Sequence, residues 1–187
     1  NGYLTASLGT TTGNSVSLKK SVQNLGLLTW TKPRYCRFSF RFSSVDYRQN
    51  WAFGLGAIIK DFIPITQIPA DASAFFVVTN ESGTNWNLYA VVSQDSTHYG
   101  SVLIGNNYFT VDTDYNFEML FYPSSGGAGG ETYFYIDGTL VATIGNPTAF
   151  AFNENSYKGE ILSFIGGNLD TNDKNIKMSY WDFWQGQ

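Results

Sequence analysis

Cysteine and long apolar runs are almost absent from this chain of 187 residues. The single cysteine, Cys36, excludes an internal disulfide and zinc sites built on several thiolates. The longest nearly apolar run covers residues 51–59 and includes two glycines, whereas a membrane-spanning helix needs roughly 20 apolar residues. We therefore expect no membrane insertion. Cys36 alternates with phenylalanines, which predicts that it is a small buried hydrophobe.

Charge is equally scarce. Charged residues form 14% of the chain, against about 25% in an average globular protein. The 11 lysines and arginines are scattered along the sequence, and the formal net charge is -4. A nucleic-acid partner would require a basic patch or stripe, so we expect no such partner.

The sequence also lacks the motifs of several common enzyme classes. No Gly-x-Ser-x-Gly motif accompanies the single histidine, His98, and no glycine-rich phosphate loop is present. The only carboxylates at an i, i+2 spacing, Asp112 and Asp114, lie in the turn-like segment VDTDYN. None of these patterns indicates a nucleophilic or phosphoryl-transfer site.

Aromatic residues are abundant, at 17%, and apolar residues recur with a period of two. This alternation predicts strands over residues 34–43, 51–59, 74–79, 86–93, 101–104, 117–122, 132–136, 139–144, 160–165 and 176–183, with one or two more within residues 2–30. Clusters of Gly, Asn, Asp, Ser and Pro separate them, as turns require. Many short strands without a helical stripe predict an all-β, two-sheet antiparallel jelly-roll β-sandwich.

The chain length fits one domain over residues 1–187. Because the sequence begins with Asn1 and not with Met, we interpret it as a domain excised from a longer protein.

Asp137 and Gly138 stand between two alternating segments in GETYFYIDGTLVATI. This dipeptide favours a two-residue hairpin, because a type I′ turn needs positive φ at both central residues. Phe134, Ile136 and Leu140 are expected to face the core, and Asp137 is interpreted as a turn residue.

The segment 113–144, TDYNFEMLFYPSSGGAGGETYFYIDGTLVATI, resembles the concanavalin A-like lectin/glucanase superfamily. In that superfamily a strand ending near an aromatic residue and a proline precedes a loop and a hairpin with an Asp-Gly turn. Tyr122-Pro123 and Tyr135-Ile136-Asp137-Gly138 match these two elements. The segment 175–184, NIKMSYWDFW, is similar to the closing strand of this fold, which lies beside the first strand.

The superfamily includes glucanases, legume-type lectins, alginate lyases and carbohydrate-binding modules, some of which occur in phage tail and baseplate proteins. Its retaining glucanases carry Glu-x-Asp-x-Glu on one strand face, which holds two carboxylates about 5–5.5 Å apart. This chain has no such triplet, and its segments WAFGLGAII, AFFVVT and WNLYAVVS contain no carboxylate. The resemblance therefore implies a non-catalytic module.

Legume-type lectins bind calcium through carboxylates and asparagines in loops. The densest cluster of such oxygens here is NLDTND at residues 168–173, and the second is formed by Asp112, Asp114 and Asn116. Neither has the spacing of an EF-hand. No cofactor is expected, with calcium left open at these two clusters.

Sugar recognition uses flat aromatic rings and planar polar groups on an exposed surface. The candidate carbohydrate-binding residues are Arg37, Arg41, Trp51, Trp86, Asn87, Tyr89, Glu118, Tyr133 and Tyr135. Most of them point away from the core side of their predicted strands. Trp51 and Trp86 stand among polar residues at strand starts but alternate with core positions, so a place in the core is the alternative for both.

We expect a non-catalytic carbohydrate-binding module that attaches a larger adhesion or phage-tail protein to cell-surface or cell-wall polysaccharide. The expected location is extracellular, at the cell surface or on a virion. One alternative is a structural or protein-interaction domain, which a contiguous apolar patch from the connection 61–73 would indicate. The other is a hydrolase or lyase of the same fold, which the release of new reducing ends would indicate.

Overall fold

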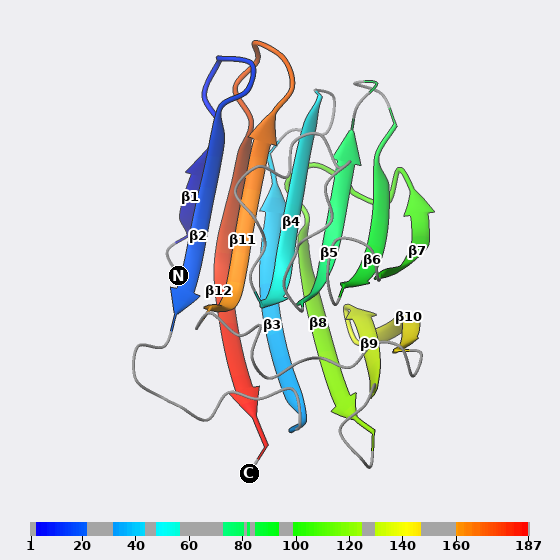
Figure 1. Cartoon of the computed structure of the whole chain (residues 1–187). Coiled ribbons are helices and arrows are strands. Elements are labelled where there is room, and N and C mark those ends of the chain that lie inside the picture. The colour runs from blue at the N-terminus through cyan, green and yellow to red at the C-terminus, as the bar shows by residue number, and fades with distance from the viewer. Residues whose placement is uncertain are drawn as a thin grey trace.

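The chain folds into two antiparallel β-sheets of six strands each, which pack face to face (Figure 1). The computed structural model describes residues 3–21, 32–43, 48–56, 73–80, 82, 85–93, 99–124, 130–146 and 160–186. Across these residues every regular element is a strand, and none forms a helix of the length and hydropathy that crossing a membrane requires. The predicted jelly-roll sandwich is confirmed.

Sheet A contains, in spatial order, β1 (Leu4–Ser7), β12 (Asn175–Gln185), β3 (Arg34–Phe42), β8 (Asp114–Pro123), β9 (Gly130–Ile136) and β10 (Thr139–Asn146). Sheet B contains β2 (Ser15–Ser21), β11 (Glu160–Asn168), β4 (Gln49–Gly56), β5 (Ser73–Asn80), β6 (Asn87–Ser93) and β7 (Tyr99–Asn106). The closing strand β12 lies between β1 and β3, as the resemblance implies. All strands predicted from residue 34 onward are present, with ends shifted by a few residues.

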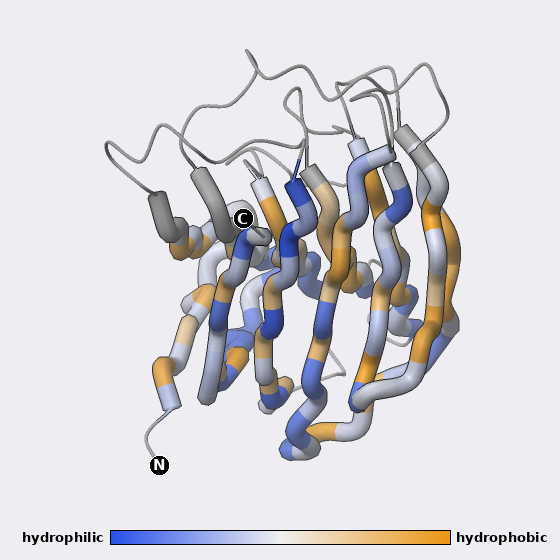
Figure 2. The backbone as a smooth tube through the Cα atoms, turned by 90° about the horizontal axis from the view of Figure 1, so that it is seen from below, coloured by the Kyte–Doolittle hydropathy of each residue, from blue (hydrophilic) through white to orange (hydrophobic). Residues whose placement is uncertain are grey.

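Aromatic side chains fill the space between the sheets. The ring centroids of Phe40 and Phe53 lie 4.6 Å apart, and those of Phe53 and Phe117 lie 4.8 Å apart. Hydrophobic and hydrophilic residues alternate along the strands, so that one side of each sheet builds this core (Figure 2). Cys36 is fully buried in the same layer, as predicted, and burial raises the pKa of its thiol.

Trp51 belongs to this core, with 1% of its surface exposed. Its ring stacks on Phe164 at 5.2 Å, and its Nε1 donates to Gln49 Oε1 at 2.7 Å. A Cβ on Gly166, the residue opposite Trp51 on β11, would lie only 2.1 Å from the indole Cζ3. The absence of a side chain at Gly166 therefore makes room for the indole.

The hairpin between β9 and β10 has the predicted turn, because Asp137 and Gly138 have φ of 49° and 76°. Asp137 Oδ1 accepts hydrogen bonds from the backbone and side-chain nitrogens of Asn116, at 2.9 and 3.1 Å. The carboxylate thus holds the turn against the start of β8, which confirms its interpretation as a turn residue.

One expectation for this hairpin was wrong. Leu140 is 50% exposed and does not face the core, because an irregularity in the register between Leu140 and Ala142 reverses the alternation of β10. Ala142 and Ile144 take the core positions instead.

We expect Gly166→Ala to lower the free energy of unfolding by about 2–3 kcal/mol, because the new methyl group must displace the Trp51 ring in a packed core. Gly145→Ala is the matched control, since a Cβ at Gly145 meets nothing within 4 Å. Its effect should stay within about 0.5 kcal/mol. Urea unfolding of both variants measures the difference, and equal midpoints would show that the ring does not pack on Gly166.

Candidate functional site

One side of sheet A points away from sheet B, and we call it the outer face of sheet A. The exposed aromatic side chains lie on or beside this face. In the part of the chain that the structure describes, the exposed tyrosines and tryptophans are Tyr3, Tyr122, Tyr180 and Trp184. The last three lie on this side of β8 and β12, and the hydroxyl of Tyr3 reaches Asp114 on β8. Trp184 is the most exposed of them, at 56%. Exposed aromatics are thus concentrated on one sheet face.

The antiparallel register arranges this face in rows that run across the strands. One row places Trp184, Tyr35, Leu120, Tyr133 and Thr143 side by side on five neighbouring strands. The next row places Asp182, Arg37, Glu118, Tyr135 and Leu140 in the same order. Neighbouring strands lie about 4.8 Å apart, so the first row brings aromatic side chains into mutual reach, and the second row does so for acidic, basic and aromatic ones.

Carboxylates of this face accept hydrogen bonds from tyrosine hydroxyls. The four tyrosine–carboxylate pairs are Tyr35 with Glu118 at 2.6 Å, Tyr180 with Asp182 at 2.9 Å, Tyr3 with Asp114 at 3.2 Å, and Tyr133 with Glu131. Hydrogen bonds to an ionised acceptor are roughly twice as strong as neutral ones, so these pairs fix the positions of both partners.

Three of these pairs also raise the pKa of the tyrosine hydroxyl. Burial, followed by the bond to Glu118, raises the pKa of Tyr35 well above its ordinary value. The bond to Glu131 raises the pKa of Tyr133, and the bond to Asp182 raises that of Tyr180.

Two arginines complete the face. Arg41 donates to both carboxylate oxygens of Asp114, at 3.0 and 2.5 Å, which lowers the pKa of that carboxyl. Its guanidinium carbon lies 5.1 Å from the centre of the Tyr3 ring. Arg37 donates to Asn116 Oδ1 at 3.3 Å and lies 5.6 Å from the centre of the Tyr180 ring. Both guanidiniums are therefore engaged within the face.

The structure brings together five of the nine candidate residues that the sequence indicated. Arg37, Arg41, Glu118, Tyr133 and Tyr135 share the outer face of sheet A.

The other four candidates do not join them. Trp51 and Trp86 are core residues, with Trp86 only 3% exposed and packed on Phe42 at 5.6 Å, so neither ring offers a face to a ligand. This corrects their assignment as binding residues. Asn87 and Tyr89 lie on sheet B, on the side away from sheet A.

That outer side of sheet B differs from the outer face of sheet A. Its central positions, Ala52, Phe75, Val77 and Val91, form a second buried apolar cluster, with Tyr89 packed against it. It therefore offers no comparable set of exposed aromatic rings among the described residues.

Several residues of the outer face of sheet A were missed. Tyr35 has the same orientation as Arg37 along β3, so alternation could have found it. Tyr180 and Trp184 follow an irregularity between Met178 and Tyr180, which shifts the alternation of β12. Trp181 has the opposite orientation and packs on Phe38, at 6.5 Å.

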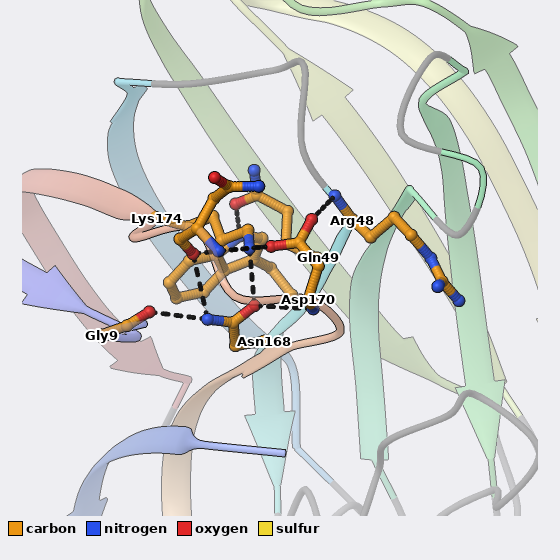
Figure 3. Close-up of polar contacts among 8 residues, drawn as sticks. Gly9, Arg48, Gln49, Asn168, Asp170 and Lys174 are labelled. Carbon is orange, nitrogen blue, oxygen red and sulfur yellow. Dashed lines mark hydrogen bonds and ion pairs between the residues drawn. The ribbon is translucent and has the colours of Figure 1, made fainter. Parts of the chain in front are cut away.

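The oxygen-rich loop 168–173 surrounds the ammonium of Lys174 (Figure 3). Nζ donates to Asn168 Oδ1 and to the Asn172 carbonyl oxygen, both at 2.6 Å, and forms an ion pair with Asp170. The Lys174 side chain is fully buried, which lowers the pKa of its ammonium. The oxygens proposed as calcium ligands are therefore already bound to a positive charge of the chain itself.

The same loop connects three parts of the sandwich. Asn168 Nδ2 donates to the Gly9 carbonyl oxygen at 2.6 Å, and the Arg48 backbone nitrogen donates to Asp170 Oδ2 at 3.0 Å (Figure 3). At the second calcium candidate, Asp114 binds Arg41 and Asn116 binds Asp137. No group of three or more His, Cys, Asp or Glu side chains suited to a metal occurs in the described ranges. The expectation of no cofactor, with calcium left open at these two clusters, stays a prediction. His98 and the connection 61–72 lie outside the described residues.

Solved structures share this arrangement of strands, although no family model and no curated protein matches the chain. A GH16 protein of the mixed-linkage glucan locus of Bacteroides ovatus aligns over 97% of this chain and 81% of its own, with 11% identity and a TM-score of 0.54. The binding domain of botulinum neurotoxin serotype D/C aligns over 95% of this chain, with 11% identity and a TM-score of 0.51. The chain spans 39% of that toxin domain. The chain therefore shares the jelly-roll fold of these two proteins.

We expect Lys174→Met to lower the free energy of unfolding by about 3 kcal/mol, because it leaves the Asp170 carboxylate and two buried oxygens without their cation. Lys177→Met, on the half-buried side of β12, is the matched control and should change stability by less than about 0.5 kcal/mol. Thermal unfolding with calcium and with a chelator completes the test. A stability of Lys174→Met equal to that of the unaltered protein would contradict the role of Lys174, and stabilisation by calcium would show that one of the two oxygen-rich clusters binds the ion.

A second prediction concerns alkaline pH. Because the folded pKa of Tyr35 is raised above the ordinary value of about 10, its contribution to stability is complete below pH ~10 and is lost as the pH rises further. Tyr35→Phe should therefore flatten the fall of unfolding free energy above pH ~10. Tyr122→Phe, on the same face, is the control and should follow the unaltered protein. The measurement is urea unfolding between pH 8 and 11.5. If the unfolding free energy of Tyr35→Phe fell with pH in parallel with that of the unaltered protein, the prediction would be contradicted.

Proposed function

We propose that this domain is a non-catalytic carbohydrate-binding module whose binding surface is the outer face of sheet A. The observation that carries the proposal is the concentration of exposed aromatic rings on this one face, among polar groups that are already hydrogen-bonded in place. Aromatic rings pack on the apolar faces of pyranose rings, while planar polar groups bind their hydroxyls. A preorganised surface of this kind loses little side-chain freedom when it binds a ligand.

The arrangement of the rows suits an extended ligand. Trp184, Tyr35 and Tyr133 belong to one row that crosses the strands, and Tyr122 packs edge-on against Tyr133 at 6.0 Å. A polysaccharide chain lying across the strands would meet several rings in succession. Each contact is weak by itself, so copies of the domain in a larger assembly would increase the overall affinity.

Two features favour binding over catalysis. The strands β4, β5 and β6, with sequences QNWAFGLG, SAFFVVTN and NLYAVVS, carry no carboxylate. The carboxylates of the outer face of sheet A are each held by a tyrosine, and Asp114 also by Arg41. The similarity to a GH16 protein keeps a glycan-active enzyme as the alternative, and new reducing ends after incubation with polysaccharides would support it.

In its biological setting the domain would hold a longer protein on a glycan. We propose a surface, secreted or phage-tail adhesion protein as the parent, and therefore an extracellular or virion-associated location. The polysaccharide would be part of a cell surface or cell wall. The other alternative, a structural domain of a viral or surface assembly, rested on the connection 61–73, of which only Ser73 is described.

Affinity electrophoresis in gels that contain single polysaccharides tests the proposed function, with the domain expected to migrate more slowly in at least one gel. Trp184→Ala should weaken that binding roughly tenfold, because a stacking ring is worth about 0.5–1.5 kcal/mol beyond the area it buries. Leu103→Ala is the control, since Leu103 is 49% exposed but lies on β7 of sheet B. Unchanged migration in all gels would contradict the proposal, and an equal loss in both variants would contradict the assignment of the face.

A further inference from the structure

We infer that the outer face of sheet A selects uncharged, hydroxyl-rich glycans and rejects polysaccharides that carry carboxylate, sulfate or phosphate groups. This inference rests on the proposed function and assigns the class of ligand that the same site takes. It follows from the hydrogen-bonding capacity of the four tyrosine–carboxylate pairs and from the charge around them.

The pairs leave mostly acceptors available to a ligand. The hydroxyls of Tyr35 and Tyr180 each donate their only proton to a carboxylate, so their oxygens can only accept from a ligand. An ionised carboxylate has about four acceptor positions, and one tyrosine occupies one of them. The remaining positions call for donors, which sugar hydroxyls supply and which ionised acidic groups do not.

Carboxylates outnumber the cations of this face. Arg41 uses two donors on Asp114, at 3.0 and 2.5 Å. Arg37 stands in its row between Asp182 and Glu118 and donates to Asn116, while its buried Nε has no hydrogen-bond partner. Lys177 lies opposite Arg41 on β12 and is the third cation. Together with Glu131, four carboxylates therefore stand among three cations, so an anionic ligand would not meet a basic surface.

The net charge of the whole chain also disfavours acidic ligands. The formal net charge of the chain is -4, so an acidic polymer would be repelled at long range as well as at the face. An acidic ligand would need a basic surface, whereas this face carries four carboxylates (Asp114, Glu118, Glu131 and Asp182) and three cations (Arg37, Arg41 and Lys177). A neutral pyranose chain has no such requirement.

The test compares one polysaccharide with its own acidic derivative. A neutral polysaccharide that retards the domain in affinity electrophoresis, from a panel of mixed-linkage β-glucan, galactomannan and glucomannan, is oxidised so that its primary hydroxyls become carboxylates. Alginate and polygalacturonate are run as natural acidic polymers. We expect at least tenfold weaker binding to the oxidised polymer, no retardation by the two acidic polymers, and the same affinity for the neutral polymer at low and high salt.

The outcomes separate this inference from the proposed function. If an acidic polymer binds as well as or better than every neutral one, the domain still binds carbohydrate and the inference is overturned. If nothing in the panel retards the domain, the proposed function itself fails.

Substitutions at the face give a second measurement. Glu118→Gln keeps the shape of the side chain but removes its charge and two acceptor positions, so we expect roughly tenfold weaker binding of the neutral polymer, in line with a hydrogen bond to a charged group. The difference between neutral and oxidised polymer should become smaller. Asp112→Asn is the control for net charge, because it removes one charge from the turn before β8 and should leave the binding of the neutral polymer unchanged. Unfolding midpoints show that both variants are folded, and equal behaviour of the two would overturn the role of Glu118.

Discussion

Aromatic packing between the two sheets is the constraint on which the other features of the molecule depend. Phe40, Phe53 and Phe117 come from three strands in two sheets, yet their ring centroids lie within 4.8 Å of the next in the series. Edge-to-face packing of this kind tolerates little displacement. Because successive side chains of a strand point to opposite sides, fixing these rings inward fixes their neighbours outward. The orientation of Arg37, Ser39 and Arg41 on β3 is a consequence of the core.

The outer faces of the two sheets use this constraint differently. Sheet B places Ala52, Phe75 and Val77 outward, and these residues are fully buried. Sheet A places tyrosines, arginines and carboxylates outward. The cross-strand register brings these polar residues close enough to form hydrogen bonds with one another. The two sheets have the same number of strands and the same antiparallel pairing, so the faces differ in the side chains at their outward positions. This is why we propose sheet A as the binding surface.

Alternation in the sequence was sufficient to predict the strands, the inward phenylalanines and the outward Arg37, Glu118 and Tyr133. It failed wherever the register is irregular. At Leu140 and before Tyr180 the alternation shifts, so that Leu140 is exposed and two exposed aromatics of β12 were missed. It also left Trp51 undecided, because its polar neighbours indicate a surface position whereas Gly166 on β11 opens a place for its ring in the core. The space for the Trp51 ring depends on which residue of the neighbouring strand lies opposite it, and the sequence alone does not show how the strands pair.

The hydrogen bonds around Lys174 connect the start of β12 to the chain segments that follow β1 and β3. Lys174 immediately precedes β12, its carbonyl oxygen accepts from Leu8, and the carbonyl oxygen of the next residue, Asn175, accepts from the backbone and hydroxyl of Ser43. The buried ammonium therefore fixes where β12 begins relative to β1 and β3. Since a shift of one residue would move every side chain of a strand to the opposite side, this anchor sets the orientation of β12 up to Met178. The irregularity after Met178 then turns Tyr180 and Trp184 outward. A cation supplied by the chain itself thus holds in register the strand that carries the most exposed ring of the proposed binding surface.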